Sequence, residues 1–114
     1  LYAVTPGFRM RVPDARKAAV SGFVGQSVIM GIRPEHLVER SRGGNIAPED
    51  SYISAKVDVV ELLGNEIFVY LDSNGTVLTA RMEPDLALTR GQQIQVAAPA
   101  DKIYFFDPKN EQAL

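Results

Sequence analysis

A two-residue turn signal in the second half of the chain constrains its fold most. Asn74-Gly75 lies between the apolar stretch 67–71 and the alternating stretch 76–82. Both residues tolerate the positive φ angles of a tight turn, so Asn-Gly between apolar stretches is the strongest short-range hairpin signal. A continuous apolar stretch such as 67–71 is typical of a central strand. We therefore predict an antiparallel hairpin whose first strand lies in the interior of a sheet.

Alternating apolar and polar residues predict further short strands. Segment 8–12 alternates in this way, and Pro13 ends it because proline cannot donate to a strand ladder. The pattern of the long segment 54–63 changes phase at Val59-Val60, which predicts a β-bulge or a strand that crosses between layers. The other predicted strands are 1–4, 27–32, 92–98 and 103–106.

Turn signals separate these strands, and no long amphipathic helix is predicted. Residues 22–25 (GFVG) are predicted as a hairpin turn, 40–50 as a polar loop and 99–102 as a single turn. About seven short strands with intervening turns are typical of a small barrel or sandwich. We therefore predict an all-β fold with one or two helical turns, in which residues 1–114 form one domain.

Charge is distributed unevenly, although the net charge is only −2. Residues 1–42 contain seven Lys or Arg and three Asp or Glu. Residues 43–114 contain five Lys or Arg and eleven Asp or Glu. The basic residues are scattered over different predicted turns and strands, and six of the nine aromatic residues lie in the acidic part. We expect no nucleic-acid partner, because a base-stacking surface requires several aromatic residues on one basic face.

The residue types that most enzymes require are scarce. The chain has no cysteine, which excludes disulfides and a thiolate metal site, and His36 is its only histidine. The motif G-x-S-x-G does not occur, and none of the four lysines follows a glycine, as the Walker A loop requires. No apolar run approaches the roughly 20 residues of a membrane span. We predict no catalytic site, no metal site and no cofactor bound by these residues.

Two motifs carry the strongest indication of function. The first, Gly31-Ile32-Arg33-Pro34-Glu35-His36-Leu37, ends an alternating strand and enters a proline turn. The residue before proline should be extended, and proline at the first position of a helical turn loses no hydrogen bond. The second, Val59-Val60-Glu61-Leu62-Leu63-Gly64-Asn65-Glu66, contains a predicted turn at Gly64-Asn65. Its two glutamates either meet a partner together or flank that turn, and the local pattern favours the turn.

Both motifs resemble the GIRPEHL and VVE-x-LGNE segments of the C-terminal TOBE domain of maltose-type sugar ABC importer ATPases. The resemblance covers nearly the whole chain, and it implies an OB-like fold with a non-catalytic regulatory and dimer-contact role. The matching positions, taken as structural or interface residues, are Gly31, Ile32, Arg33, Pro34, Glu35, His36, Leu37, Glu61, Leu63, Gly64, Asn65 and Glu66.

The resemblance also implies partners and a location. In that family the domain follows an ATP-binding domain that uses ATP and magnesium, and it contacts a second copy of the subunit. That ATP-binding domain meets the membrane subunits, a regulatory protein can bind, and the complex lies at the cytoplasmic face of the membrane. The solute is maltose, another sugar or glycerol phosphate. The chain begins at Leu1 within a predicted strand, so we expect a fragment that lacks the ATP-binding domain and the family's first strand.

A second hypothesis remains open. A free-standing OB-like module could bind nucleic acid or a small oxyanion, since related β-barrels in molybdate handling bind anions between subunits. For the importer hypothesis, a homodimer contact must be self-complementary about a two-fold axis. We expect the acidic stretch 58–66 and the basic Arg33 and Arg40 to supply opposite charges there, with a monomer–dimer equilibrium for these residues alone.

Overall fold

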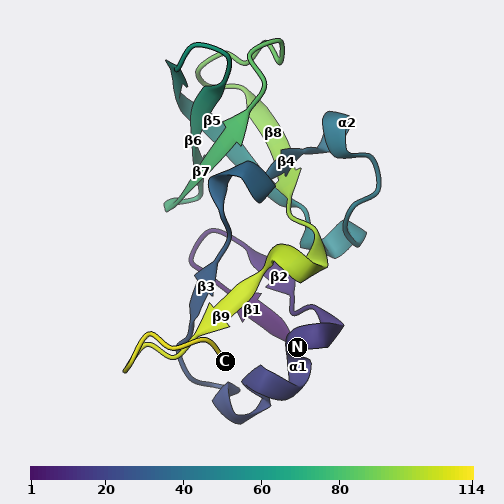
Figure 1. The fold of residues 1–114 in the computed structure, drawn as a ribbon, viewed down its shortest axis with the longest axis vertical. Helices are drawn as coiled ribbons and strands as arrows, with labels where there is room; N and C mark the ends of the chain where they lie inside the picture. Colours follow the sequence, from purple (N-terminus) through teal and green to yellow (C-terminus); the bar gives the residue numbers. More distant parts are fainter.

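The predicted hairpin is present in the computed structural model, which describes residues 1–114 (Figure 1). Strand β6 (Ile67–Ser73) pairs antiparallel with β7 (Thr76–Met82). Asn74 and Gly75 connect them with φ angles of 48° and 97°, and the Gly75 N–H donates to Asp72 Oδ1 at 2.7 Å. Strand β6 lies between β7 and a further strand, which confirms that it is an interior strand.

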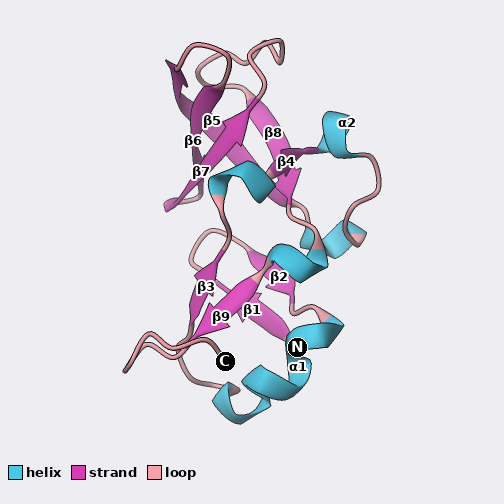
Figure 2. Cartoon of the chain, in the orientation of Figure 1, coloured by secondary structure: helices cyan, strands magenta, loops and turns pink.

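Nine strands, two short α-helices and four 3-10 turns make up the chain (Figure 2). Five strands form the main sheet, in the order β4-β8-β5-β6-β7, and the others form two pairs, β1-β2 and β3-β9. The remaining strands are β1 (Tyr2–Val4), β2 (Arg9–Arg11), β3 (Ile29–Gly31), β4 (Val38–Glu39), β5 (Ile53–Leu62), β8 (Gln93–Ala97) and β9 (Tyr104–Phe106). The helical elements are α1 (Asp14–Val20), η1 (Ser21–Phe23), η2 (Pro34–His36), α2 (Arg40–Gly43), η3 (Glu49–Ser51) and η4 (Ala100–Lys102).

The long strand β5 contains the predicted irregularity. Its pairing with β6 shifts register between Val57 and Val59, next to the predicted phase change. The N–H of Val57 donates to the Gln92 carbonyl at 2.8 Å, and its carbonyl accepts from the Gly91 N–H at 2.7 Å. A bulge bends a strand and increases its twist. Figure 1 shows the main sheet curled, which agrees with the predicted barrel-like fold.

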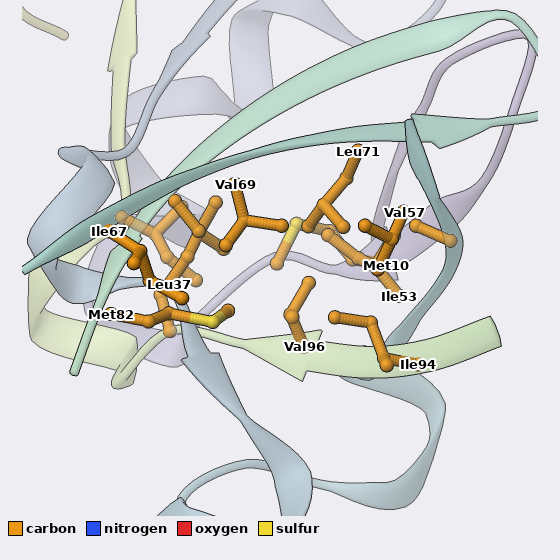
Figure 3. Close-up of a cluster of buried hydrophobic side chains, with 14 of the residues drawn as sticks. Met10, Leu37, Ile53, Val57, Ile67, Val69, Leu71, Met82, Ile94 and Val96 are labelled. Atoms are coloured by element: carbon orange, nitrogen blue, oxygen red, sulfur yellow. The ribbon is translucent and has the colours of Figure 1, made fainter. Parts of the chain in front are cut away.

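The hydrophobic core fills the inside of this curl (Figure 3). Alternation places Ile94, Val96 and Ala98 inward, as predicted, and all three are buried. The core cluster contains Met10, Val12, Val20, Leu37, Ile53, Ala55, Val57, Ile67, Val69, Leu71, Ala80, Met82, Ile94, Val96, Ala98, Ile103 and Phe105. Its members come from the main sheet and from the elements beside it, so one core joins both parts of the chain.

The two strand pairs and α1 form what we call the small-sheet region, at the lower end in Figure 1. Tyr2, Ala3 and Val4 of β1 pair with β2, while β3 pairs with β9. Both chain termini lie in this region (Figure 1). It contributes Met10 and Phe105 to the core, at 1% and 3% exposure.

Three local predictions differ from the structure. Residues 14–20 form helix α1, which the strand pattern did not predict; alanine-rich residues favour helix, and Lys17 pairs with Asp14 at 2.8 Å. The GFVG segment begins in η1 directly after α1 and is not a hairpin turn. The polar loop 40–50 begins with the one-turn helix α2, because Glu39 caps it by accepting the Ser41 N–H at 3.0 Å. None of the helices has the length and apolar character required to cross a membrane.

Candidate functional site

The two sequence motifs meet at one groove of about 540 Å³ at an end of the main sheet. Glu35 and Leu37 come from the first motif, and Asn65 and Glu66 come from the second. Nearly thirty positions separate the two pairs in the sequence. We call this the motif groove, and it is lined by Glu35, Leu37, Val38, Glu39, Arg42, Asn65, Glu66, Arg81, Met82, Glu83 and Leu86.

The first motif is positioned by η2, whose geometry follows from its proline. Arg33 is extended, with φ −69° and ψ 145°, as the residue before a proline should be. Pro34 occupies the start of the turn, and the Leu37 N–H donates to its carbonyl at 3.3 Å. Leu37 is only 3% exposed, so it anchors the turn in the core and leaves Glu35 at the surface.

Glu35 is the exposed carboxylate of the first motif at the groove. Its pKa is lowered, chiefly by a hydrogen bond from its own backbone N–H and further by the nearby Arg81, His36 and Arg33. Partial desolvation opposes this shift. None of the ion pairs in the structure involves Glu35. It therefore presents an ionised carboxylate without an ion-pair partner to the groove.

The second motif is positioned by a tight turn at the end of β5. Gly64 has a φ of 71°, and the Leu63 N–H donates to the Glu66 carbonyl at 2.9 Å. The Glu66 carboxylate accepts from Arg81 Nε at 3.1 Å, across to β7. This ion pair fixes Glu66 in the groove, while Asn65 remains exposed at the turn.

Residues outside both motifs complete the groove. Arg42 of α2 lies with its Nη1 3.2 Å from Asp85 Oδ1 and 3.8 Å from Glu83 Oε2. Arg81 occupies an outward-facing position in the alternating stretch 76–82, so the alternation in the sequence already indicated that its side chain is exposed. No sequence signal pointed to Arg42, because its one-turn helix was predicted as loop. Neither arginine was among the predicted site residues.

The charges of the motif groove determine what it can bind. Four glutamates and two arginines line it, and both arginines are already paired with carboxylates of the same chain. The excess negative charge favours basic or hydrogen-bonding side chains of a partner and disfavours anions. No serine, cysteine or histidine lines the groove, so it offers none of the usual nucleophiles or bases.

The structure does not bring the other motif residues into the groove. Gly31 lies opposite Tyr104 of β9, and a Cβ there would lie 2.8 Å from Phe106 Cε2. His36 is half-buried, and its Nδ1 has no hydrogen-bond partner. The motif residues outside the groove are Gly31, Ile32, Arg33, Pro34, His36, Glu61, Leu63 and Gly64.

Arg40, an expected dimer charge, is engaged within the chain. Its guanidinium forms a bidentate ion pair with Glu49, donates to Gln95 Oε1 at 2.9 Å, and stacks 4.2 Å above the Tyr52 ring. The hydrogen bond between them raises the pKa of Arg40 and lowers the pKa of Glu49. Glu66 is likewise paired with Arg81, so two of the charges expected at a dimer contact already have partners.

The strand order and the groove define a class, a small OB-like β domain with a polar surface groove. The family model described as the TOBE domain matches residues 30–106, and the model described as the MalK OB fold domain matches residues 2–37. The chain therefore belongs to the TOBE domain family, in the form found in sugar ABC transporter ATP-binding proteins.

Curated relatives agree with this family. The chain is 30% identical to the ABC transporter ATP-binding protein YurJ of Bacillus subtilis, covering 100% of this chain and 31% of that protein. It is 31% identical to the sulfoquinovosyl glycerol transport ATP-binding protein SmoE of Agrobacterium fabrum, covering 98% of this chain and 30% of that protein. It is 36% identical to the maltose/maltodextrin import ATP-binding protein MalK of Vibrio cholerae, covering 72% of this chain and 21% of that protein. The chain thus spans less than a third of the length of these relatives.

A solved structure shares the fold. The cytoplasmic molybdate-binding protein ModG matches with a TM-score of 0.63, covering 80% of this chain and 71% of that one. The sequence identity is 13%, so the likeness shows the OB-like fold alone.

Proposed function

We propose that residues 1–114 act as a non-catalytic regulatory and dimer-contact domain of the ATP-binding subunit of an ABC importer for carbohydrates or glycerol phosphate. Membership of the TOBE family supports this, as do relatives whose names describe ATP-binding subunits for sugar import. The observation that carries the proposal is the motif groove. Two motifs of the family, far apart in sequence, meet there and expose Glu35 and Asn65 to a partner.

The proposed roles divide the motif residues into two kinds. Pro34 and Gly64 set the turn geometry that brings the motifs together, and Gly31 leaves room for the Phe106 ring beside the first motif. Glu35, Asn65 and Glu66 form the contact surface for a second protein, either the second copy of the subunit or a regulatory protein. ATP and magnesium belong to the rest of the parent subunit, which also meets the membrane subunits on the cytoplasmic side.

The anion-binding alternative has weaker support. ModG shares the fold, but the motif groove of this chain carries more carboxylates than guanidinium groups. A molybdate-like or phosphate-like anion would meet like charge there, and the two arginines that could offset it are paired within the chain.

Introduction of positive charge in the groove tests the proposal in the full-length subunit assembled with its importer. Glu35→Lys and Asn65→Lys should weaken subunit association or the response to a regulator by about tenfold, which corresponds to about 1.4 kcal/mol. Asp101→Lys is the matched control, because Asp101 is exposed in η4 outside the groove. Sedimentation and solute uptake measure both effects. Equal behaviour of all three variants would contradict the proposed contact surface.

Calorimetry tests the non-catalytic part of the proposal. Titration of ATP with magnesium into residues 1–114 should give no saturable heat, because the chain has no Walker A sequence to hold the phosphates. Saturable binding at micromolar ATP would show instead that this domain itself is a nucleotide site.

A further inference from the structure

Two opposite charges without ion-pair partners flank Pro34 in the first motif. Arg33 and Glu35 are both exposed, and neither takes part in any ion pair of the chain. Of the other seven arginines, only Arg90 likewise lacks both an ion pair and a stacked aromatic ring. The six engaged arginines are Arg9, Arg11, Arg16, Arg40, Arg42 and Arg81.

Glu35 is also the one glutamate of the motif groove that has no side-chain or capping partner. Two of the other three pair with arginines of the same chain, and the third caps α2. These three are Glu66, Glu83 and Glu39. Arg33 comes two positions before Glu35 but does not line the groove. The groove therefore lacks one positive charge, and the turn beside it presents a free guanidinium on its outer side.

The turn holds the backbone of both charged residues in place. Pro34 restricts Arg33 to its extended conformation, and the His36 N–H donates to the Arg33 carbonyl at 2.9 Å. Leu37, at 3% exposure, anchors the turn in the core. Because the backbone is already ordered, less conformational entropy is lost when a partner binds to it.

We propose that Arg33 of a second copy of the subunit enters the motif groove and pairs with Glu35, and that Arg33 of the first copy pairs in the same way with Glu35 of the second. This inference rests on the proposed dimer-contact role of the domain. A two-fold contact repeats every pair in the reverse direction, so a surface that carries both charges close together is self-complementary. Each copy thus supplies the charge that the other copy lacks.

Apolar side chains of the second motif give this contact the area that its charges need. Ion pairs that stay exposed contribute little, because water and salt screen them. Leu62 and Leu63 are 75% and 42% exposed, and the Leu63 N–H bonds to the carbonyl of Glu66, which lines the groove. Leucines at the edge of the contact exclude water from the two pairs once a second copy covers them.

A regulatory protein fits these charges less well. It would bring a basic side chain to Glu35, but Arg33 would stay unpaired unless the same protein also presented an acid in the reverse order. A small anion would pair with Arg33 and leave Glu35 without a counter-charge. A second copy satisfies both charges with no residue beyond those already in the turn.

Mixing two single variants of the full-length subunit, without ATP, tests the proposal. Arg33→Glu and Glu35→Arg should each raise the dimer dissociation constant by about tenfold or more, because each homodimer opposes like charges twice. A mixture of the two variants should restore the affinity of the unaltered dimer, because both pairs across the two-fold axis are again of opposite sign. Sedimentation measures the dimers, and energy transfer between differently tagged copies measures the mixed dimer.

Matched controls use exposed charges elsewhere on the domain. Arg90→Glu and Asp101→Arg make the same charge changes at residues that have no ion pair and lie outside the groove. Both should leave the dimer dissociation constant unchanged. Equal weakening in these controls would overturn the proposal, since net charge alone would then explain the effect.

The outcomes distinguish this inference from the proposed function. Restored association in the mixture supports the pairing between copies, because the charges within each copy remain altered there. Weak association of both variants and of their mixture would overturn the pairing but keep the groove as a dimer contact. Unaltered dimers with a weakened response to a regulatory protein would overturn it in favour of that protein. No effect on either measurement would contradict the proposed function as well.

Discussion

The main sheet and the small-sheet region share one core but not one hydrogen-bond ladder. In the main sheet, five strands pair continuously, and residues such as Val69 and Leu71 are fully buried inside its curl. The small-sheet region has two separate strand pairs, each of three residues a strand. Its side chains enter the shared core, while the outer edge of β9 is bonded by the C-terminal segment, where the Leu114 N–H donates to the Phe105 carbonyl at 2.9 Å. This region therefore depends on side-chain contacts with the main sheet for its stability.

Two polar links join the regions besides the core. At one, the Gly7 N–H donates to Thr76 Oγ1 at 3.1 Å, and Asn74 Nδ2 donates to the Gly7 carbonyl at 3.3 Å. At the other, the Asp50 carboxylate of η3 accepts from the Tyr2 hydroxyl at 2.9 Å and from Arg11 at 2.8 Å. Each link is open to a direct test.

Truncation of a core side chain should lower the free energy of unfolding most, whichever of the two regions it lies in. Leu71→Ala in the main sheet and Met10→Ala in the small-sheet region should each lower the free energy of unfolding by about 2–5 kcal/mol. Both side chains belong to one cluster, at 0% and 1% exposure. Urea unfolding followed by circular dichroism and tyrosine fluorescence should give one coincident transition for each variant. Two separate transitions for Met10→Ala would contradict the shared core, because the two regions would then unfold independently.

Gly7→Ala should have the next largest effect, because it separates the two regions at their tightest contact. A Cβ on Gly7 would lie 1.6 Å from the backbone oxygen of Ser73, so backbone must move. We expect a loss of about 1–3 kcal/mol, as for other overpacked sites, measured by thermal and urea unfolding. Gly22→Ala is the matched control, since nothing lies within 4 Å of a Cβ there. A loss in the control equal to that in Gly7→Ala would mean that the contact is not the cause.

A change in the turn that positions the second motif should lower the free energy of unfolding less still, because it strains only that turn. Gly64 has a φ of 71° and open space around it, so Gly64→Ala should cost about 1–2 kcal/mol from backbone strain alone. Gly64→Asn should retain most of the stability, since asparagine tolerates this conformation. An unchanged melting temperature for Gly64→Ala would show that the turn relaxes to another conformation.

Lowering the pH should weaken the hydrogen bonds that Asp50 accepts from Tyr2 and Arg11. The resulting loss of stability should be the smallest of the four predicted effects. The Tyr2 hydroxyl and then Arg11 lower the pKa of Asp50, so its contribution to stability is present above its unfolded pKa and is lost as the pH falls through the folded one. The melting temperature should fall more between about pH 5 and about pH 2 in the unaltered chain than in Asp50→Asn. Parallel curves would mean that this exposed link contributes nothing measurable.

Local sequence patterns predicted every strand except β4, but of the strand pairings they predicted only the β6–β7 hairpin. Alternation placed Val96 inward and Arg81 outward, and the Asn74-Gly75 turn fixed the β6–β7 register, because these features depend on neighbouring residues. Helix α1 was missed since a short alanine-rich segment bounded by Pro13 has no long amphipathic period. The motif groove depends on Arg42 meeting Asp85, which is 43 positions away, and no local pattern encodes such a meeting.

The bulge in β5 has a consequence for how much the length of this strand can vary. Before it, Val57 faces the core, and after it Val60 packs against the core while Glu61 faces solvent. Regular alternation of this same sequence, without the bulge, would reverse the facing of every later side chain in the strand. Glu61 would then turn inward and Val60 outward. Deletion of Asp58 would thus make β5 a regular strand and keep the second motif in phase with the core, whereas the loss of the bulge without a deletion would rephase that whole motif.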